Sequence, residues 1–360
     1  MKIGIMSTQI FTVPPNKYGG LERQAYYQAK ALFKLGHDVT VFAPTGSISN
    51  GWKIFETGEA EASNPEDKRY LLFRDSLKEM DYILDNSWAK MSMMDYDNSL
   101  GIMHGYRPYA RYPPHGMLVA VSAWHAKEIE KLMGKIDYVN PAYFKVPFLY
   151  NAVDSTFTTG NHEDYLIYMS RFSGYKGASV FIDLCVRHKR KGILIGGEKY
   201  VEDPSFIQLI KDKAKKNGLD FRGEVEEKEK IELLSHADML VSPLMPPYYE
   251  VFGMNLVEAM SYGTIPYVTM EGAAEEIVGD GGWTIDTFSS MMRAKELPPT
   301  TDEMRKKAVE RAKFFSIDML GKRIEALIKY HQEEFLPNKD MFARIGRWDI
   351  ELNARKGLKN

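Results

Sequence analysis

Short apolar segments alternate with amphipathic helical segments along this chain, and no other feature of the sequence constrains its fold as strongly. Residues 2–6 and 39–43 are apolar and of strand length, and residues 21–35 between them carry apolar side chains at helical spacing. A strand, a helix and a second strand in this order form a βαβ unit with parallel strands. We therefore expect an α/β fold of the doubly wound type.

The alternation runs in two series along the 360 residues, and the second series starts at Tyr165. One core rarely extends beyond about 250–300 residues, so two domains are expected. We predict an N-terminal domain over 1–153, a C-terminal domain over 154–336, and a separate helix in 337–360 after the break at Pro337. Further strands are expected near 82–84, 100–103, 117–121, 166–169, 192–195, 220–221, 239–241 and 265–268. Further helices are expected near 71–80, 123–132, 178–188, 205–217, 228–235, 254–261 and 341–352.

Charge and cysteine content narrow the class of protein. Lys and Arg total 47 against 49 Asp and Glu, so the basic excess of a general nucleic-acid binder is missing and such binding is not expected. Cys185 is the single cysteine, which excludes an intrachain disulfide and suits a reducing cytoplasm. No apolar run approaches the roughly 20 residues that span a bilayer. We expect a cytoplasmic protein, at most peripheral at a membrane.

The most informative segment runs from Glu250 to Glu258, after a predicted strand and a proline-rich loop. Gly253 lies where the next helix should start, and a helix N-terminus offers free N–H groups and a positive dipole end to a phosphate. Eight helical residues span about 12 Å, so the two carboxylates could accept hydroxyl hydrogen bonds at either end of a diphosphate-linked ligand. A capped amphipathic helix with two solvated glutamates would show the same pattern.

Two further segments suit a phosphate-bearing ligand. Arg171 and Lys176 follow the first strand of the second series, where paired cations and nearby glycines favour phosphate binding, although a solvated basic turn is the alternative. Gly19 and Gly20 precede the first helix and would let backbone approach a ligand, or simply form a flexible turn. The G-x-G-x-x-G fingerprint is missing there, which disfavours a nicotinamide or flavin site.

Together these segments resemble retaining glycosyltransferases of the large GT-B family 4, which includes glycogen synthases and bacterial mannosyltransferases. The resemblance covers most of the chain and is strongest from Tyr165 to Trp283. It implies two Rossmann-like domains facing a cleft, with the C-terminal helix crossing back to the N-terminal, acceptor-binding domain. The matching positions are Glu250, Phe252, Gly253 and Glu258; Ser170, Arg171, Lys176 and Gly177; Gly19, Gly20 and Glu22; Asn151, Val153 and Asp154; and His104. Ser170 and Ala152 replace glycines of the family pattern.

The resemblance also implies a role for each matching residue. Arg171 and Lys176 would hold the donor diphosphate, Glu250 the transferred sugar and Glu258 the ribose. His104 would lie near the donor sugar, and it counts with Arg171, Lys176 and Glu250 as a catalytic candidate. The donor-binding candidates are Gly19, Gly20, Phe252, Gly253, Met254 and Glu258.

The loop after His104 interleaves tyrosines and arginines, and we expect it to contribute to acceptor binding. Aromatic faces suit sugar rings, and arginine suits phosphate or carboxylate; a proline-stiffened surface loop is the alternative. The acceptor candidates are Tyr106, Arg107, Tyr109 and Arg111.

Asp95 and Asp97 form an Asp-x-Asp pattern that could hold Mg²⁺ or Mn²⁺ in a different transferase fold, but the stretch is also typical of a surface loop. We therefore expect no metal and no other cofactor.

The expected activity is the transfer of a sugar, and a hexose in particular, from a nucleotide-diphosphate sugar to a glycan, lipid or small molecule, with retention. Alternatives are a nucleotide-sugar epimerase or a phosphorylase of the same fold, or a non-catalytic protein that binds nucleotide sugars.

Overall fold

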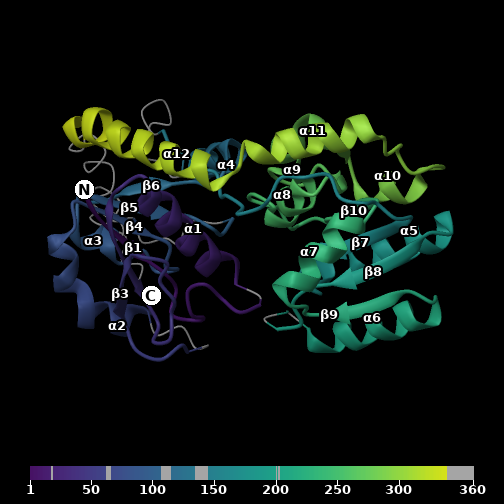
Figure 1. The fold of residues 1–360 in the computed structure, drawn as a ribbon, viewed down its shortest axis with the longest axis horizontal. Coiled ribbons are helices and arrows are strands. Elements are labelled where there is room, and N and C mark those ends of the chain that lie inside the picture. Colours follow the sequence, from purple (N-terminus) through teal and green to yellow (C-terminus); the bar gives the residue numbers. More distant parts are fainter. Residues whose placement is uncertain are drawn as a thin grey trace, which may run out of the picture. The chain divides into compact units, whose positions relative to one another are not determined.

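The computed structural model describes residues 1–17, 19–61, 66–106, 115–133, 145–199, 201 and 203–338. These residues form two compact units (Figure 1). The first unit contains the described parts of Met1–Pro15, Gly19–Asn151 and the chain from Ile317 onward, and the second is made mainly of Ala152–Ser316.

Six strands of the described first unit form a parallel sheet in the order β3-β2-β1-β4-β5-β6. The central strand β1 places Ile3 opposite Val39 on one side and opposite Tyr82 on the other. The strands are β1 (Lys2–Met6), β2 (Asp38–Ala43), β3 (Lys53–Glu56), β4 (Tyr82–Asp85), β5 (Ser99–Ile102) and β6 (Met117–Val119). The helices are α1 (Gly20–Lys34), α2 (Glu66–Phe73), α3 (Ser92–Asp95), α4 (Ala123–Met133), α12 (Ile317–Tyr330) and short turns at Arg74–Glu79, His331–Phe335 and Leu336–Asn338.

The second unit repeats this architecture, and its described residues form a six-stranded parallel sheet in the order β12-β11-β10-β7-β8-β9. The strands are β7 (Tyr165–Met169), β8 (Lys191–Ile195), β9 (Asp220–Gly223), β10 (Met239–Ser242), β11 (Ile265–Thr269) and β12 (Trp283–Ile285). The helices are α5 (Ala178–His188), α6 (Pro204–Lys216), α7 (Glu227–His236), α8 (Met254–Ser261), α9 (Ala274–Val278), α10 (Phe288–Arg293), α11 (Asp302–Lys313) and short 3-10 turns at Gly174–Lys176 and Gly279–Gly281.

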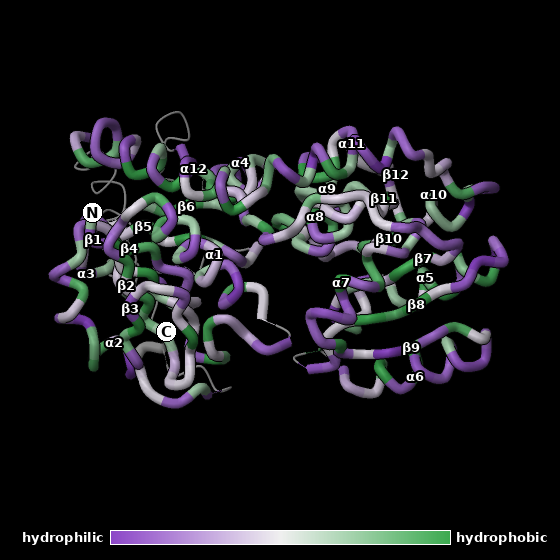
Figure 2. Tube along the Cα trace, viewed as in Figure 1, coloured by the Kyte–Doolittle hydropathy of each residue, from purple (hydrophilic) through white to green (hydrophobic). Residues whose placement is uncertain are grey.

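The central strands of the second sheet are apolar because helices cover both faces of the sheet. Every residue of β7, β10 and β11 is buried, as expected for parallel strands that lie between helical layers. Figure 2 shows the same distribution in colour, with hydrophobic residues along the central strands and hydrophilic residues on the outer helices. Polar side chains can therefore approach a ligand only where the strands end.

Local sequence signals explain where several helices begin. Asp203 caps α6 by accepting a hydrogen bond from the Ser205 N–H at 2.9 Å, and Pro204 occupies the first helical position. Thr301 caps α11 by accepting from the Met304 N–H at 3.3 Å. These caps satisfy N–H groups that have no partner within the helix.

The structure confirms the doubly wound α/β fold with two Rossmann-like parallel sheets. Strands β3 and β12, which were not expected from the sequence, are short edge strands without a fully buried residue. Edge strands lack the continuous apolar run of a central strand, so the sequence contains little signal for them. The helix expected over 71–80 is instead the end of α2 followed by the 3-10 turn Arg74–Glu79.

Helix α12 returns to the first unit, earlier in the chain than the predicted return at residue 337. It packs on α1, where Gly321 lies against Ala31, and Lys34 Nζ contacts Asp318 Oδ1 at 2.7 Å (Figure 1). Just after α12, the Nδ1 atom of His331 lies 3.2 Å from the Tyr82 hydroxyl. The apolar face of α12 therefore packs in the first unit. The predicted boundary, which placed this helix in a C-terminal domain over 154–336, is wrong at this point.

The predicted helix over 341–352 lies outside the described residues. Among the described helices, none combines the length and the apolar character that a bilayer crossing requires.

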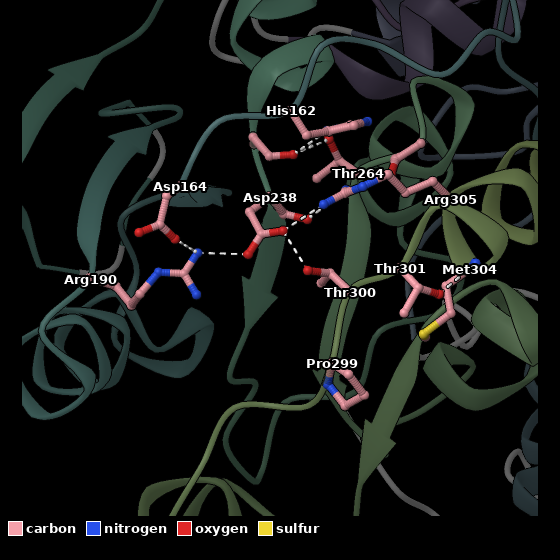
Figure 3. A network of polar contacts seen from close by, with 12 residues as sticks. His162, Asp164, Arg190, Asp238, Thr264, Pro299, Thr300, Thr301, Met304 and Arg305 are labelled. Carbon is pink, nitrogen blue, oxygen red and sulfur yellow. Dashed lines mark hydrogen bonds and ion pairs between the residues drawn. The ribbon is translucent and has the colours of Figure 1, made fainter.

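A network of charges around Asp238 holds the amino-terminal edge of the second sheet (Figure 3). Asp238 directly precedes β10, and its carboxylate accepts hydrogen bonds at 2.6 Å from Arg190, Arg305 and the Thr300 hydroxyl. Burial alone would raise the pKa of Asp238, but these three donors hold it below its usual value. Arg190 also contacts Asp164, whose side chain is 85% exposed.

We predict that Asp238→Ala lowers the free energy of unfolding by about 2–4 kcal/mol, because it leaves the buried Arg305 guanidinium without its carboxylate and leaves Arg190 with only the exposed Asp164. The matched control is Asp164→Ala, which removes an exposed partner of Arg190 and should cost less than about 1 kcal/mol. Urea denaturation followed by circular dichroism measures both. Because the folded-state pKa of Asp238 is depressed, its stabilisation is complete above about pH 4 and declines as the pH falls further. Equal costs for the two variants would contradict the role of the network.

Candidate active site

Two loops at the carboxyl-terminal edge of the second sheet bring the predicted donor residues together. One loop follows β7 and contains Arg171 and Lys176, and the other follows β10 and ends at Glu250. Strands β7 and β10 are neighbours, and the strand order runs outward in opposite directions from them. This is the topological switch point of the sheet, where open α/β folds bind their ligands.

A buried ion pair joins the two loops. Lys176 Nζ lies 2.6 Å from Glu250 Oε2 and donates to the Tyr248 hydroxyl at 2.8 Å. The side chains of Lys176 and Glu250 are only 8% and 15% exposed. Burial alone would lower the pKa of Lys176, but the Glu250 carboxylate and Tyr248 reverse the effect and raise it. The loop therefore holds a fixed positive charge away from bulk water.

Arg171 lies in the same loop and is partly exposed. Its backbone carbonyl accepts a hydrogen bond from the Tyr168 hydroxyl at 2.9 Å, which ties the loop to the end of β7. Burial and Glu250 raise the pKa of Tyr248, while the charges of Lys176 and Arg171 act in the opposite direction. Both predicted phosphate-binding cations therefore act on one tyrosine.

Helix α8 begins at this edge without a side-chain cap. Gly253 is its N-cap residue and has a φ of 89°, a left-handed conformation that glycine adopts without strain. The Asn255 side chain donates to the carbonyl of Met169 at 2.9 Å and so fixes the first turn beside β7. Phe252 is 1% exposed and packs edge-to-face on Phe315, so its side chain belongs to the core and only its backbone is placed to meet a ligand.

Glu258 contacts a residue that the sequence analysis missed. Lys230 on α7 donates to Glu258 Oε1 at 2.9 Å and lies 3.0 Å from Glu227 Oε1. The side chains of Lys230 and Glu258 are 15% and 17% exposed. Lys230 falls in a run of alternating charges that is typical of a solvated helix face, so only the packing of α7 on α8 reveals its role.

In the first unit, His104 follows β5 and is partly exposed. Its Nε2 atom lies 2.9 Å from Asn86 Oδ1, and Asn86 directly follows β4. Burial, together with the charges of Lys90 and His125, holds the pKa of His104 well below its usual value. The imidazole is therefore neutral at pH 7.

Gly19 and Gly20 open α1, as the sequence predicted. Glu22 in the first turn is 3% exposed and accepts a hydrogen bond from the Thr8 hydroxyl, at the end of β1. Burial raises the pKa of Glu22 despite that hydrogen bond. The glutamate of the Gly-Gly-x-Glu segment therefore links α1 to β1.

The acceptor candidates are only partly described. The Tyr106 ring stacks on Trp124 with centroids 6.0 Å apart, and its hydroxyl donates to Glu128 Oε2 at 3.3 Å. The other three candidates, Arg107, Tyr109 and Arg111, lie outside the described residues.

The Asp-x-Asp carboxylates are each engaged by neighbouring side chains. Asp95 accepts a hydrogen bond from the Tyr70 hydroxyl at 2.7 Å and pairs with Arg74 at 3.2 Å. Asp97 lies 3.0 Å from the Nδ1 atom of His115. Across the described part of the chain, no three His, Cys, Asp or Glu side chains form a group suited to a metal ion. Cys185 is buried in the core of the second unit, where burial raises the pKa of its thiol to about 12.

Comparisons with known proteins identify the class of the second unit and the fold of the chain. Residues 156–313 match the family described as glycosyl transferases group 1. No curated protein sequence matches the chain. Sucrose-phosphate synthase from Thermosynechococcus elongatus is similar in structure, with a TM-score of 0.70 and 15% identity over 91% of this chain and 98% of that one.

Two more solved structures show the same similarity. AviGT4, a glycosyltransferase involved in avilamycin A biosynthesis, has a TM-score of 0.66 and 18% identity over 92% of this chain and 97% of its own. Anabaena HepE in complex with UDP-glucose has a TM-score of 0.66 and 14% identity over 91% of this chain and 99% of its own. The chain therefore has the GT-B fold, and it is an enzyme of the glycosyltransferase class. The group 1 domain is the one that contains Lys176, Glu250 and Glu258.

We predict that Gly272→Ala disturbs the site, because Gly272 has a φ of +87° and an added Cβ would lie 2.3 Å from the Glu250 carbonyl oxygen. The variant should lose more than about 1 kcal/mol of stability and should bind nucleotide more weakly. Gly174→Ala is the matched control in the same unit, since nothing lies within 4 Å of its added Cβ. Thermal melting with and without UDP measures both effects. Indistinguishable melting temperatures for the two variants would contradict the constraint on Glu250.

Proposed function

We propose that this enzyme transfers a hexose, with retention of anomeric configuration, from a nucleotide-diphosphate sugar to an acceptor. The observation that carries the proposal is the buried Lys176–Glu250 pair at the switch point of the group 1 domain. It places a fixed cation and a carboxylate side by side, as a diphosphate linked to a hydroxyl-rich sugar requires. The UDP-glucose complex of Anabaena HepE, which has the same fold, supports a nucleotide-sugar donor.

Several residues of the second unit each have a distinct role in the proposed reaction. Arg171 and Lys176 bind the diphosphate, and the backbone N–H groups at the start of α8, near Gly253 and Met254, add contacts to phosphate and sugar. Glu250 accepts hydrogen bonds from the transferred sugar, and Glu258 accepts them from the ribose. Lys230 donates a hydrogen bond to Glu258 and so holds that side chain on α8 in place.

The proposed chemistry is electrostatic. Glycosyl transfer passes through an oxocarbenium-like transition state while negative charge builds on the leaving diphosphate. Lys176 and Arg171 stabilise that negative charge, and Glu250 lies where positive charge develops on the sugar. In the proposed front-face reaction, the leaving phosphate oxygen takes the proton of the acceptor hydroxyl as that oxygen attacks the anomeric carbon. The protein then needs no covalent nucleophile and no cofactor beyond the donor.

A thermal-shift screen tests the donor directly. UDP, ADP, GDP and their glucose conjugates are mixed with the full chain, because a ligand that binds only the folded state raises the melting temperature. The proposal expects one base to stabilise the second unit, and release of its nucleoside diphosphate when an acceptor is added. Binding without any release would favour a non-catalytic binding protein, and conversion of the sugar on an intact donor would favour an epimerase.

We predict different kinetic defects for the two glutamates. The ribose does not change during the reaction, so Glu258→Gln should raise the donor KM more than it lowers kcat. Glu250 faces developing charge, so Glu250→Gln should lower kcat by about 10²–10³. Steady-state kinetics with the donor varied separate the two effects, and melting temperatures show whether Lys176 tolerates the loss of its partner. The opposite pattern would mean that the donor binds in the reverse orientation.

We also predict that transfer survives excess EDTA, because Lys176 and Arg171 are placed to neutralise the diphosphate. Rates of nucleoside diphosphate release, measured with EDTA and then with added Mn²⁺, check this. The proposal of a metal-independent reaction fails if EDTA abolishes the activity and Mn²⁺ restores it, and Asp95 and Asp97 would then be re-examined by substitution with Asn.

A further inference from the structure

The Lys176 ammonium group lies against one aromatic side chain, that of Tyr248 in the loop after β10. Lys176 Nζ donates a hydrogen bond to the Tyr248 hydroxyl at 2.8 Å and lies 4.0 Å from the centre of the Tyr248 ring. The hydroxyl oxygen offers a lone pair and the ring offers its electron-rich face, and both attract a cation. Tyr248 therefore contacts the ammonium group through two of its parts.

The backbones of the two loops hold these side chains at a fixed separation. Gly177 in the loop after β7 has a φ of +74°, and an added Cβ would lie 2.0 Å from the Pro243 carbonyl oxygen, so the two backbones are in direct contact there. The Met245 N–H donates to the carbonyl of Tyr175 at 2.9 Å, and the Tyr248 N–H donates to the carbonyl of Met245 at 3.1 Å. The loop after β10 therefore carries Tyr248 at a defined distance from the loop after β7.

Tyr248 can orient the ammonium group without neutralising it. The negative charge of Glu250 offsets that of Lys176, whereas a phenol is uncharged. Burial and the charge of Glu250 raise the pKa of Tyr248, so its hydroxyl keeps its proton at pH 7. Tyr248 and Glu250 accept two of the three N–H bonds of the ammonium group. The third N–H has no acceptor within the described part of the chain.

We propose that Tyr248 is a positioning residue that orients the Lys176 ammonium group, so that its third N–H is donated to a diphosphate oxygen of the bound ligand. The diphosphate in this statement rests on the proposed function, whereas the hold on the ammonium group does not. A lysine side chain has four flexible carbons, and fixing its end before binding reduces the conformational entropy that the ligand must overcome. Tyr248 therefore acts on the ligand only through Lys176.

The hold on the ammonium group is tested without any ligand, by ¹H–¹⁵N spectra of the full chain labelled at the lysine side-chain nitrogens. Lys176 is assigned from the signal lost in Lys176→Met. A buried, hydrogen-bonded ammonium group exchanges its hydrogens slowly with water, so the wild type should show this signal. Tyr248→Phe keeps the ring but removes the acceptor, and it should accelerate the exchange by about 10-fold, the scale of one lost hydrogen bond.

A matched control makes the same chemical change in the neighbouring loop. The Tyr175 side chain is 40% exposed, and its hydroxyl makes no contact with Lys176 in the described structure. Tyr175→Phe should therefore leave the Lys176 signal unchanged. A wild type without a slowly exchanging Lys176 signal, or the same exchange rate in Tyr248→Phe as in the wild type, overturns the hold.

A double-mutant cycle tests whether Tyr248 acts through Lys176. Titration calorimetry measures the binding of UDP, and of ADP and GDP in parallel. Tyr248→Phe should weaken the nucleotide that binds the wild type by about 10-fold, and Tyr175→Phe should leave its affinity unchanged. In the Lys176→Met background, Tyr248→Phe should cause no further loss, because the group through which it acts is missing.

The cycle also separates this proposal from the proposed function. Equal losses from Tyr248→Phe in both backgrounds would mean that Tyr248 contacts the ligand itself, and would overturn the positioning role. Unaltered affinity in Tyr248→Phe would overturn it as well. If none of the three nucleotides binds the wild type while Tyr248→Phe accelerates the exchange at Lys176, the proposed donor fails and the hold of Tyr248 on the ammonium group stands.

Discussion

Burial of both faces of each parallel sheet is the constraint on which the rest of this structure depends. Once helices cover a sheet, its strands must be apolar, and polar groups are confined to the edges where strands begin or end. In the second unit the loops after β7 and β10 meet at such an edge, and the Lys176–Glu250 pair joins them. In the first unit Asn86 and His104 follow β4 and β5 in the same way.

The two edges of the second sheet hold charges for different purposes. At the amino-terminal edge, the Asp238 carboxylate accepts hydrogen bonds from three side chains of the same unit, and these bonds stabilise that unit. At the carboxyl-terminal edge, Lys176 and Glu250 form a largely buried ion pair that joins the loops after β7 and β10. Desolvated pairs of this kind contribute little to the stability of a fold, because the cost of removing both charges from water offsets their attraction.

The sequence was enough to select the charged residues of the candidate site, but it did not reveal the residues that contact them. Arg171, Lys176, Glu250 and Glu258 stand at recognisable spacings after predicted strands and at a helix start. Lys230 could not be found in this way, because its partner Glu258 belongs to another helix. Phe252 was assigned to the donor site by resemblance, but its side chain packs in the core on Phe315.

The sequence by itself determined the alternation of strands and helices, the two parallel sheets and the positions of the charged motifs, because apolar periodicity and motif spacing are local properties. Only the tertiary structure decided where α12 packs, which edge strands complete the sheets, and which side chains meet across elements. The Gln28–Asn86–His104 contact joins residues that lie far apart in the chain. Its hydrogen bonds form only after α1, β4 and β5 have packed, since long-range contacts depend on the packing of whole elements and leave no periodic signal in the sequence.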